Sequence, residues 1–176
     1  WGARIYFDGL RAPADVMRID VTGKQWMWKV QHPTGQREIN ALHVPVGVPI
    51  ELSMISEDVI HDFYIPAFRL KQDVIPGRAI DFNLTPTREG RYRLRDSQFS
   101  GTWFAANQAD VVVESLTDHA AWLKQAAAAP LQSGLSVAAA EYRERLNHPR
   151  VGWPTVVPAP PPQVNVPGTS TLPHDA

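Results

Sequence analysis

The chain contains no cysteine. This absence excludes disulfide bridges, zinc–thiolate sites, thiol nucleophiles and any metal pair bridged by cysteine sulfur. No stretch approaches the roughly 18 consecutive apolar residues that a transmembrane helix needs. Charge of one sign is not in excess, because 17 basic and 18 acidic residues leave a net charge of −1. That balance argues against a nucleic-acid partner and against a polybasic membrane-binding face. Phosphate-binding loops and nucleophile-elbow motifs are also absent.

Short segments with alternating apolar and polar residues fill most of the first 113 positions. Turn signals such as Pro33-Thr34-Gly35 and Pro76-Gly77 separate them. The expected strands cover residues 18–23, 25–31, 39–44, 48–55, 59–65, 79–84, 90–94 and 109–113. Many short strands with a turn about every 8–12 residues predict an all-β sandwich or barrel.

The pattern changes after Glu114. Thr117 is the expected cap of an alanine-rich helix over residues 118–129, and Ser136 is the expected cap of a second helix over 136–146. Prolines are then so frequent that residues 151–176 are expected to form an extended, flexible tail. The predicted organisation is therefore an N-terminal arm (1–14), a β domain (15–115), a helical extension (116–150) and the proline-rich tail (151–176).

Residues 96–107, DSQFSGTWFAAN, carry the most informative motif. Their spacing resembles the copper-binding loop of cytochrome oxidase subunit II, C-x-[EQ]-x-C-G-x-x-H-x-x-M. The scaffold positions match at Gln98, Gly101, Thr102, Trp103 and Ala106. The ligand positions do not match, because Asp96, Ser100, Phe104 and Asn107 stand where the family has Cys, Cys, His and Met.

Two further segments resemble the same family in the expected order. The first is Val21–Trp28, and the second is Asp58–Asp73 followed by Pro76-Gly77-Arg78. Together the similarity covers about residues 15–125. It implies a cupredoxin-like Greek-key β-barrel in a heme-copper terminal oxidase. In that family the domain follows two transmembrane helices, which would precede the arm at residues 1–14. It docks on catalytic subunit I, on the periplasmic or thylakoid lumenal side of a membrane-anchored complex.

The resemblance also shows what is missing from the family's dinuclear copper centre, CuA. Such a pair needs two bridging thiolates, two imidazoles, a thioether and a carbonyl. The degenerate positions are His61, Asp96, Gln98, Ser100, Phe104 and Asn107. Only His61 survives as a side-chain ligand, and Gln98 still offers a carbonyl. We therefore expect no cofactor in this domain, with heme and copper confined to the partner subunit.

Two interpretations remain open for His61 and Asp96, which the fold would bring together. They are either a residual mononuclear copper or zinc site, or a hydrogen-bonded relic in which Asp96 accepts from His61 or from loop amides. A neutral amide at Gln98 is also a poor magnesium ligand, where many relatives have glutamate. The other histidines show no ligand spacing and are expected at the surface or in turns: His32, His43, His119, His148 and His174.

Two other groups of residues match the family. Trp26 and Trp28 lie in the segment that carries the electron-entry tryptophan of cytochrome c oxidases, and without CuA we favour a packing role for both. A second group matches the segment on the face toward the catalytic subunit, and the resemblance implies interface ion pairing for Arg69, Lys71, Asp73 and Arg78.

The sequence thus supports a ranked set of hypotheses. The first is a non-catalytic subunit II domain that has lost CuA. It would be a structural cap in a quinol-oxidising complex, similar to the alternative respiratory terminal oxidases of cyanobacteria or related bacteria. It would have no active site of its own. The alternatives are a mononuclear copper-handling module and an engineered domain with its copper ligands deleted.

Overall fold

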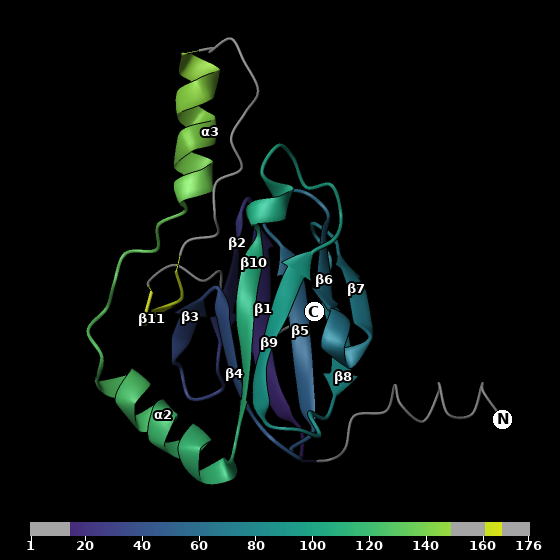
Figure 1. The fold of residues 1–176 in the computed structure, drawn as a ribbon, viewed down its shortest axis with the longest axis vertical. Helices are drawn as coiled ribbons and strands as arrows, with labels where there is room; N and C mark the ends of the chain where they lie inside the picture. Colours follow the sequence, from purple (N-terminus) through teal and green to yellow (C-terminus); the bar gives the residue numbers. More distant parts are fainter. Residues whose placement is uncertain (1–14, 149–160, 167–176) are drawn as a thin grey trace, which may run out of the picture.

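The fold is seen in a computed structural model that describes residues 15–148 and 161–166. The arm at 1–14 and most of the tail lie outside these described residues. Two β-sheets face each other, and two helices flank them (Figure 1). The first sheet has, in spatial order, β11 (Gln163–Val164), β3 (Arg37–Ile39), β2 (Met27–Gln31), β1 (Met17–Lys24), β5 (Ile50–Ser56) and β8 (Ile80–Leu84). The second has β4 (Ala41–Pro45), β10 (Gln108–Glu114), β9 (Gly90–Asp96), β6 (His61–Ile65) and β7 (Leu70–Val74).

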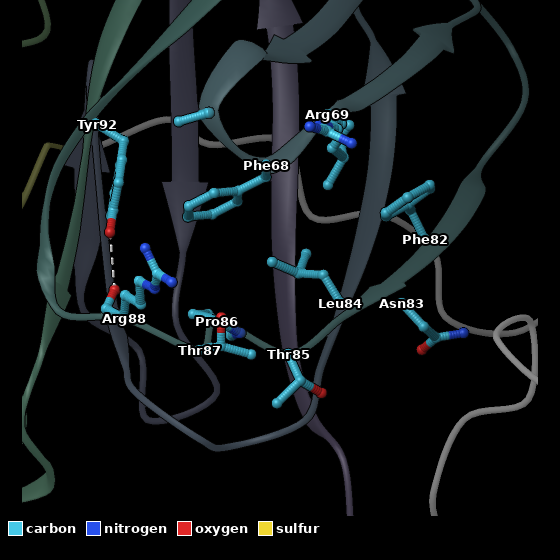
Figure 2. Close-up of a pocket in the computed structure, with 12 residues that line it drawn as sticks. Phe68, Arg69, Phe82, Asn83, Leu84, Thr85, Pro86, Thr87, Arg88 and Tyr92 are labelled. Atoms are coloured by element: carbon cyan, nitrogen blue, oxygen red, sulfur yellow. Dashed lines mark hydrogen bonds between the residues drawn. The ribbon is translucent and has the colours of Figure 1, made fainter.

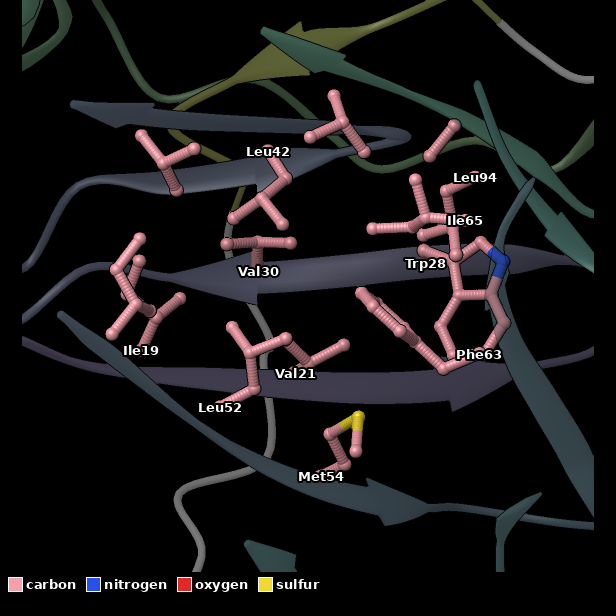
Figure 3. Close-up of a cluster of buried hydrophobic side chains, with 14 of the residues drawn as sticks. Ile19, Val21, Trp28, Val30, Leu42, Leu52, Met54, Phe63, Ile65 and Leu94 are labelled. Carbon is pink, nitrogen blue, oxygen red and sulfur yellow. The ribbon is translucent and has the colours of Figure 1, made fainter. Parts of the chain in front are cut away.

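The pairing is mostly antiparallel. The exceptions are β1 with β5 and β4 with β10, which run parallel. The core lies between the two sheets (Figure 3). It forms because alternate residues of each strand point inward, as in β10, where every second side chain is buried. Ile19, Val21 and Leu52 of the first sheet face Phe63 and Leu94 of the second. The all-β prediction is confirmed.

Three details differ from the sequence prediction. Strand β7 was not expected, because its central Lys71-Gln72-Asp73 is polar; it is an edge strand with one exposed face. Helix α2 (Leu116–Ala128) is capped by Ser115, whose hydroxyl accepts from the Asp118 amide, so the predicted cap at Thr117 is wrong. Helix α3 (Val137–Asn147) is capped by Ser136 as predicted.

The third difference concerns the tail. Residues 163–164 form β11, which pairs with β3, and Val166 is buried against Met27 and Ile39. This part of the tail is thus extended, as its prolines predict, but it is held on the sheet. Among the described residues, no helix is both long enough and apolar enough to cross a membrane.

Candidate functional site

The loop that joins β9 to β10 closes one end of the sandwich. It contains the short 3-10 helix η2 (Phe104–Ala106) and packs on the turn between β1 and β2. The side chains of Gln25 and Trp26 both donate to the carbonyl oxygen of Ser100, at 2.7 and 3.2 Å. Gly101 has φ +112°, and a Cβ there would lie 2.9 Å from the Trp26 ring. Glycine is therefore required for the loop to approach this tryptophan so closely.

His61, the first residue of β6, lies beneath this loop with a fully buried side chain. Both ring nitrogens contact carboxylates. Nδ1 lies 2.7 Å from Asp96 Oδ2, and Nε2 lies 2.8 Å from Asp58 Oδ1. Asp58 also accepts from the backbone amide of Gln25 at 2.8 Å, which ties the histidine to the β1–β2 turn. The ring is therefore held between two carboxylates.

Asp96 is the centre of the network. Its carboxylate accepts from Ser100 Oγ at 2.8 Å, from Asn107 Nδ2 at 3.0 Å and from the backbone amide of Asp62 at 2.9 Å. The backbone amide of Gln98 donates to it as well, at 3.2 Å. The carboxylate thus provides an acceptor for four donors of the loop and of β6.

The structure thus brings together four of the six degenerate copper positions: His61, Asp96, Ser100 and Asn107. The other two take no part through their side chains. Phe104 packs against Phe99, with ring centroids 5.5 Å apart, and the Gln98 side chain is exposed. Asp58 belongs to the site but was not anticipated, although a carboxylate three residues before a histidine is a visible signal.

Electrostatics favour a charged imidazole at the centre. Burial alone would lower the pKa of His61, but the hydrogen bonds from its ring to Asp58 and Asp96 outweigh burial and raise that pKa to about 9. Burial likewise tends to raise the pKa of Asp58, yet the hydrogen bond from His61 lowers it overall. At neutral pH the site holds an imidazolium that donates to two carboxylates.

These residues do not fit a dinuclear copper centre. The chain has no thiolate to bridge two ions, and a phenyl ring replaces one imidazole. The remaining imidazole already uses both nitrogens. Within residues 15–148 and 161–166, no group of three or more acidic, histidine or cysteine side chains is arranged to hold a metal ion.

Comparison with known proteins agrees with this geometry. A family model described as the periplasmic domain of cytochrome c oxidase subunit II matches residues 34–116. That segment belongs to the cytochrome c oxidase subunit II family. The crystal structure of the periplasmic domain of subunit II (CoxB) of Bradyrhizobium japonicum superimposes with a TM-score of 0.61 at 26% identity, covering 65% of this chain and 96% of that one. The cupredoxin-like fold implied by the resemblance is confirmed.

Relatives of this subunit II domain include oxidases of different kinds. The alternative cytochrome c oxidase subunit 2 of Bradyrhizobium diazoefficiens is 28% identical over 155 residues, covering 70% of this chain. The quinol oxidase subunit 2 of Bacillus cereus is 27% identical over 110 residues, covering 62% of this chain. The chain spans only 56% and 38% of the lengths of these two proteins.

The subunit II domain buries both tryptophans of the segment that resembles the family's electron-entry segment. Trp26 is 1% exposed, because helix α3 lies over it. Tyr142 meets the Trp26 ring edge-on at 5.2 Å, and Arg145 lies 5.4 Å from the centroid of Trp103. Trp28 is 0% exposed and packs on Phe63 within the main core. Packing, the role that we favour for both tryptophans, agrees with this burial.

The four residues expected at the subunit interface lie along one edge of the domain. All four are exposed: Arg69, Lys71, Asp73 and Arg78. Lys71 lies 3.1 Å from the buried carboxylate of Asp62, so one of its contacts is already within the domain. The Lys71 ammonium group is itself largely exposed, so solvent screens the pair and it contributes little stability. The other three remain candidates for contacts outside the domain.

A cluster of histidines was missed by sequence analysis. His119 is buried in α2 and His43 is half-buried in β4, so the prediction of surface or turn positions is wrong for these two. His32 is also buried, but it opens a turn as predicted, because its carbonyl accepts from the Gly35 amide at 2.9 Å. Glu38, fully buried, joins His32 Nε2 at 2.7 Å and His43 Nδ1 at 2.6 Å. Trp122 of α2 stacks on His43 with centroids 4.3 Å apart. His148 is exposed as expected, and His174 lies outside the described residues.

We expect the stability of the subunit II domain to fall in alkali because of His61. A folded pKa of about 9, against an ordinary value of 6.5, means that the contribution is complete below pH 6.5 and is lost as pH rises to 9. The gap between the two values corresponds to about 3 kcal/mol. Urea unfolding at pH 6, 7.5 and 9.5 measures it. H61Q is the control, and an equal pH dependence in that variant would contradict the assignment.

We expect helix α2 to loosen in acid because of His119. Burial and the neighbouring His32 lower the pKa of His119 below 6.5, so the folded state prefers its neutral form. The resulting stability is present above pH 6.5 and is lost as pH falls through the folded pKa. Hydrogen exchange of residues 116–128, corrected for intrinsic rates, should be faster at pH 5.5 than at pH 7. The variant H119F should flatten this difference; no difference in the wild type would disprove the claim.

Proposed function

We propose that this chain is the extramembrane domain of a heme-copper oxidase subunit II that works without CuA. It caps the catalytic subunit in a complex that membrane quinol reduces. The observation that carries the proposal is the state of the former copper position. A buried imidazolium, donating to Asp58 and Asp96, stands where the family needs a copper pair. Electrons from a soluble one-electron donor would find no acceptor in this domain.

The cover over Trp26 supports the same proposal. In cytochrome c oxidases this position belongs to the electron-entry segment, which a donor must approach. Here Tyr142 of α3 contacts the ring. A helix over this surface suits a subunit whose outer face is not used for electron entry.

The exposed residues on the β7 edge give the cap its proposed contact surface. Asp73 and Arg78, both exposed, would form ion pairs with the catalytic subunit, on the side of the membrane that corresponds to the periplasm. In this proposal oxygen reduction, heme and copper belong to the catalytic subunit, and the domain holds that subunit in position.

Oxygen consumption by the assembled oxidase tests the proposal. A short-chain ubiquinol should support turnover, whereas reduced cytochrome c should give no rate above the donor-free control. Turnover with cytochrome c comparable to that with quinol would overturn the proposal. The control is an oxidase with an intact CuA subunit, which must accept cytochrome c under the same conditions.

Metal analysis addresses the copper-handling alternative separately. We expect no copper to remain after copper loading and desalting of the domain, because both nitrogens of His61 are engaged. About one tightly held copper per chain, lost in H61A, would support the alternative instead.

A further inference from the structure

A cleft opens between the edges of the two sheets, far from the His61 network in the fold. Strands β7 and β8 each have a neighbour on one side only, and the cleft lies where their edges face each other. Its volume is about 600 Å³. Sites for small ligands usually measure roughly 300–1,000 Å³, so the cleft has the size of a binding site.

The floor of the cleft is apolar. Phe68, Phe82, Leu84 and the ring of Tyr92 line it and are only partly buried. Phe68 and Tyr92 meet edge to face, with centroids 4.8 Å apart. Apolar surface that the domain leaves partly open is stabilised when an apolar ligand covers it.

Two arginines add charge of one sign. Arg69 and Arg88 both line the cleft, and within the part of the chain that the structure describes no carboxylate does. Among the described residues, neither guanidinium forms an ion pair or a hydrogen bond. In Figure 2 the side chains of Phe68 and Leu84 lie between these two arginines. Arg69 also has φ +53°, a conformation that residues other than glycine rarely adopt. The 3-10 helix η1 (Pro66–Phe68) holds it there through the Arg69 amide, which donates to the Pro66 carbonyl.

We propose that this cleft binds one anionic lipid. The head group, a carboxylate or a phosphate, lies over Phe68 and pairs with Arg69 and Arg88 from its two sides. The acyl chain extends from there over Leu84 and Phe82 (Figure 2). Guanidinium groups match both kinds of head group, because their paired N–H donors suit two oxygens. The aliphatic chain needs no hydrogen-bond partner, which fits a floor built from side chains of this kind. This inference does not depend on how the oxidase receives electrons.

Calorimetric titration with laurate, below its micelle concentration, tests the proposal on the whole chain. We expect saturable binding of one laurate, about tenfold weaker in R69Q and in R88Q because each removes a charge-assisted contact. R95Q is the matched control, since Arg95 is an exposed arginine of β9 outside the cleft. L84W fills the cleft without changing its charge and should abolish binding. Circular dichroism shows whether each variant folds.

Two further probes complete the test. Dodecanol should bind far more weakly than laurate, and equal binding would overturn the role of the arginines. Vesicles of phosphatidylglycerol that retain the wild type but not the double variant R69Q/R88Q would assign the lipid to the membrane. Laurate binding without vesicle binding would assign a free fatty acid, and either result supports the site. Absence of laurate binding, as expected if a protein segment occupies the cleft instead, would overturn the proposal.

Discussion

Replacing His61 by alanine should lower the free energy of unfolding by about 3–5 kcal/mol, which is typical when one partner of a buried ion pair is removed. Asp96 would keep its amide and hydroxyl donors but lose the only cation that it contacts among the described residues. The imidazole also fills space beside Gly23, where a Cβ would lie 3.0 Å from the ring, so its removal leaves a cavity. Chemical unfolding at pH 7 measures the change.

His148 supplies the matched control for this prediction. It is an exposed histidine outside the network, and H148A should change stability by less than about 0.5 kcal/mol. D96N is a second test, because it keeps the shape of the side chain but leaves the imidazolium with one carboxylate. A loss below about 1 kcal/mol in H61A would show that the pair is weak and that the loop is held by other contacts.

Much of this site was predictable from spacing. The alignment of residues 96–107 with the copper loop placed Asp96, Ser100 and Asn107 near His61, and hydrogen bonds join all four. The spacing of the copper-loop motif does not predict the second carboxylate, Asp58. Asp58 reaches the ring only because residues 57–60 turn back before β6, and the Gln25 amide fixes that turn from another strand pair.

The histidine cluster shows a different limit. His32 follows β2, His43 lies in β4 and His119 lies in α2, so no local pattern connects them. They meet because β4 pairs in parallel with β10, and α2 folds back onto β4 directly after β10 ends. Because Glu38 is buried, its charge is costly unless it is paired, and His32 and His43 supply the partners. Burial of Glu38 tends to raise its pKa, but its hydrogen bonds to His32 and His43 lower that pKa to about 2.

Strands were predicted correctly where apolar and polar residues alternate clearly, and were missed where this alternation is weak. Buried and partly exposed residues alternate along the whole of β10, and every second residue is buried from position 19 to 23 in β1 and from 50 to 56 in β5. Strand β7 has only its two end residues buried, and its pairing comes from β6 alone. Similarly, Ser115 and Thr117 are both good helix caps, and only the position of the β10 end selects the first.

Restoring the family ligand set should recreate a copper centre on this backbone. The changes D96C, S100C, F104H and N107M would supply two thiolates, an imidazole and a thioether around His61. Three of these positions already lie around His61, because Ser100 and Asn107 donate to Asp96, which accepts from the ring, so the geometry for coordination is largely present. Removal of Asp96 also frees one ring nitrogen for copper. We expect the quadruple variant to bind a copper pair and to show the intense purple colour of bridging thiolates.

The measurement is a visible spectrum with metal analysis after copper loading and desalting. Adding H61A to the quadruple variant is the control, and it should lose the colour, because the copper pair needs both imidazoles. A folded quadruple variant that stays colourless would mean that the β9–β10 loop cannot approach copper geometry. In that case the substitution of the copper ligands was followed by a rearrangement of the site. The loop then repacked around the Asp58–His61–Asp96 network, and α3 packed over Trp26.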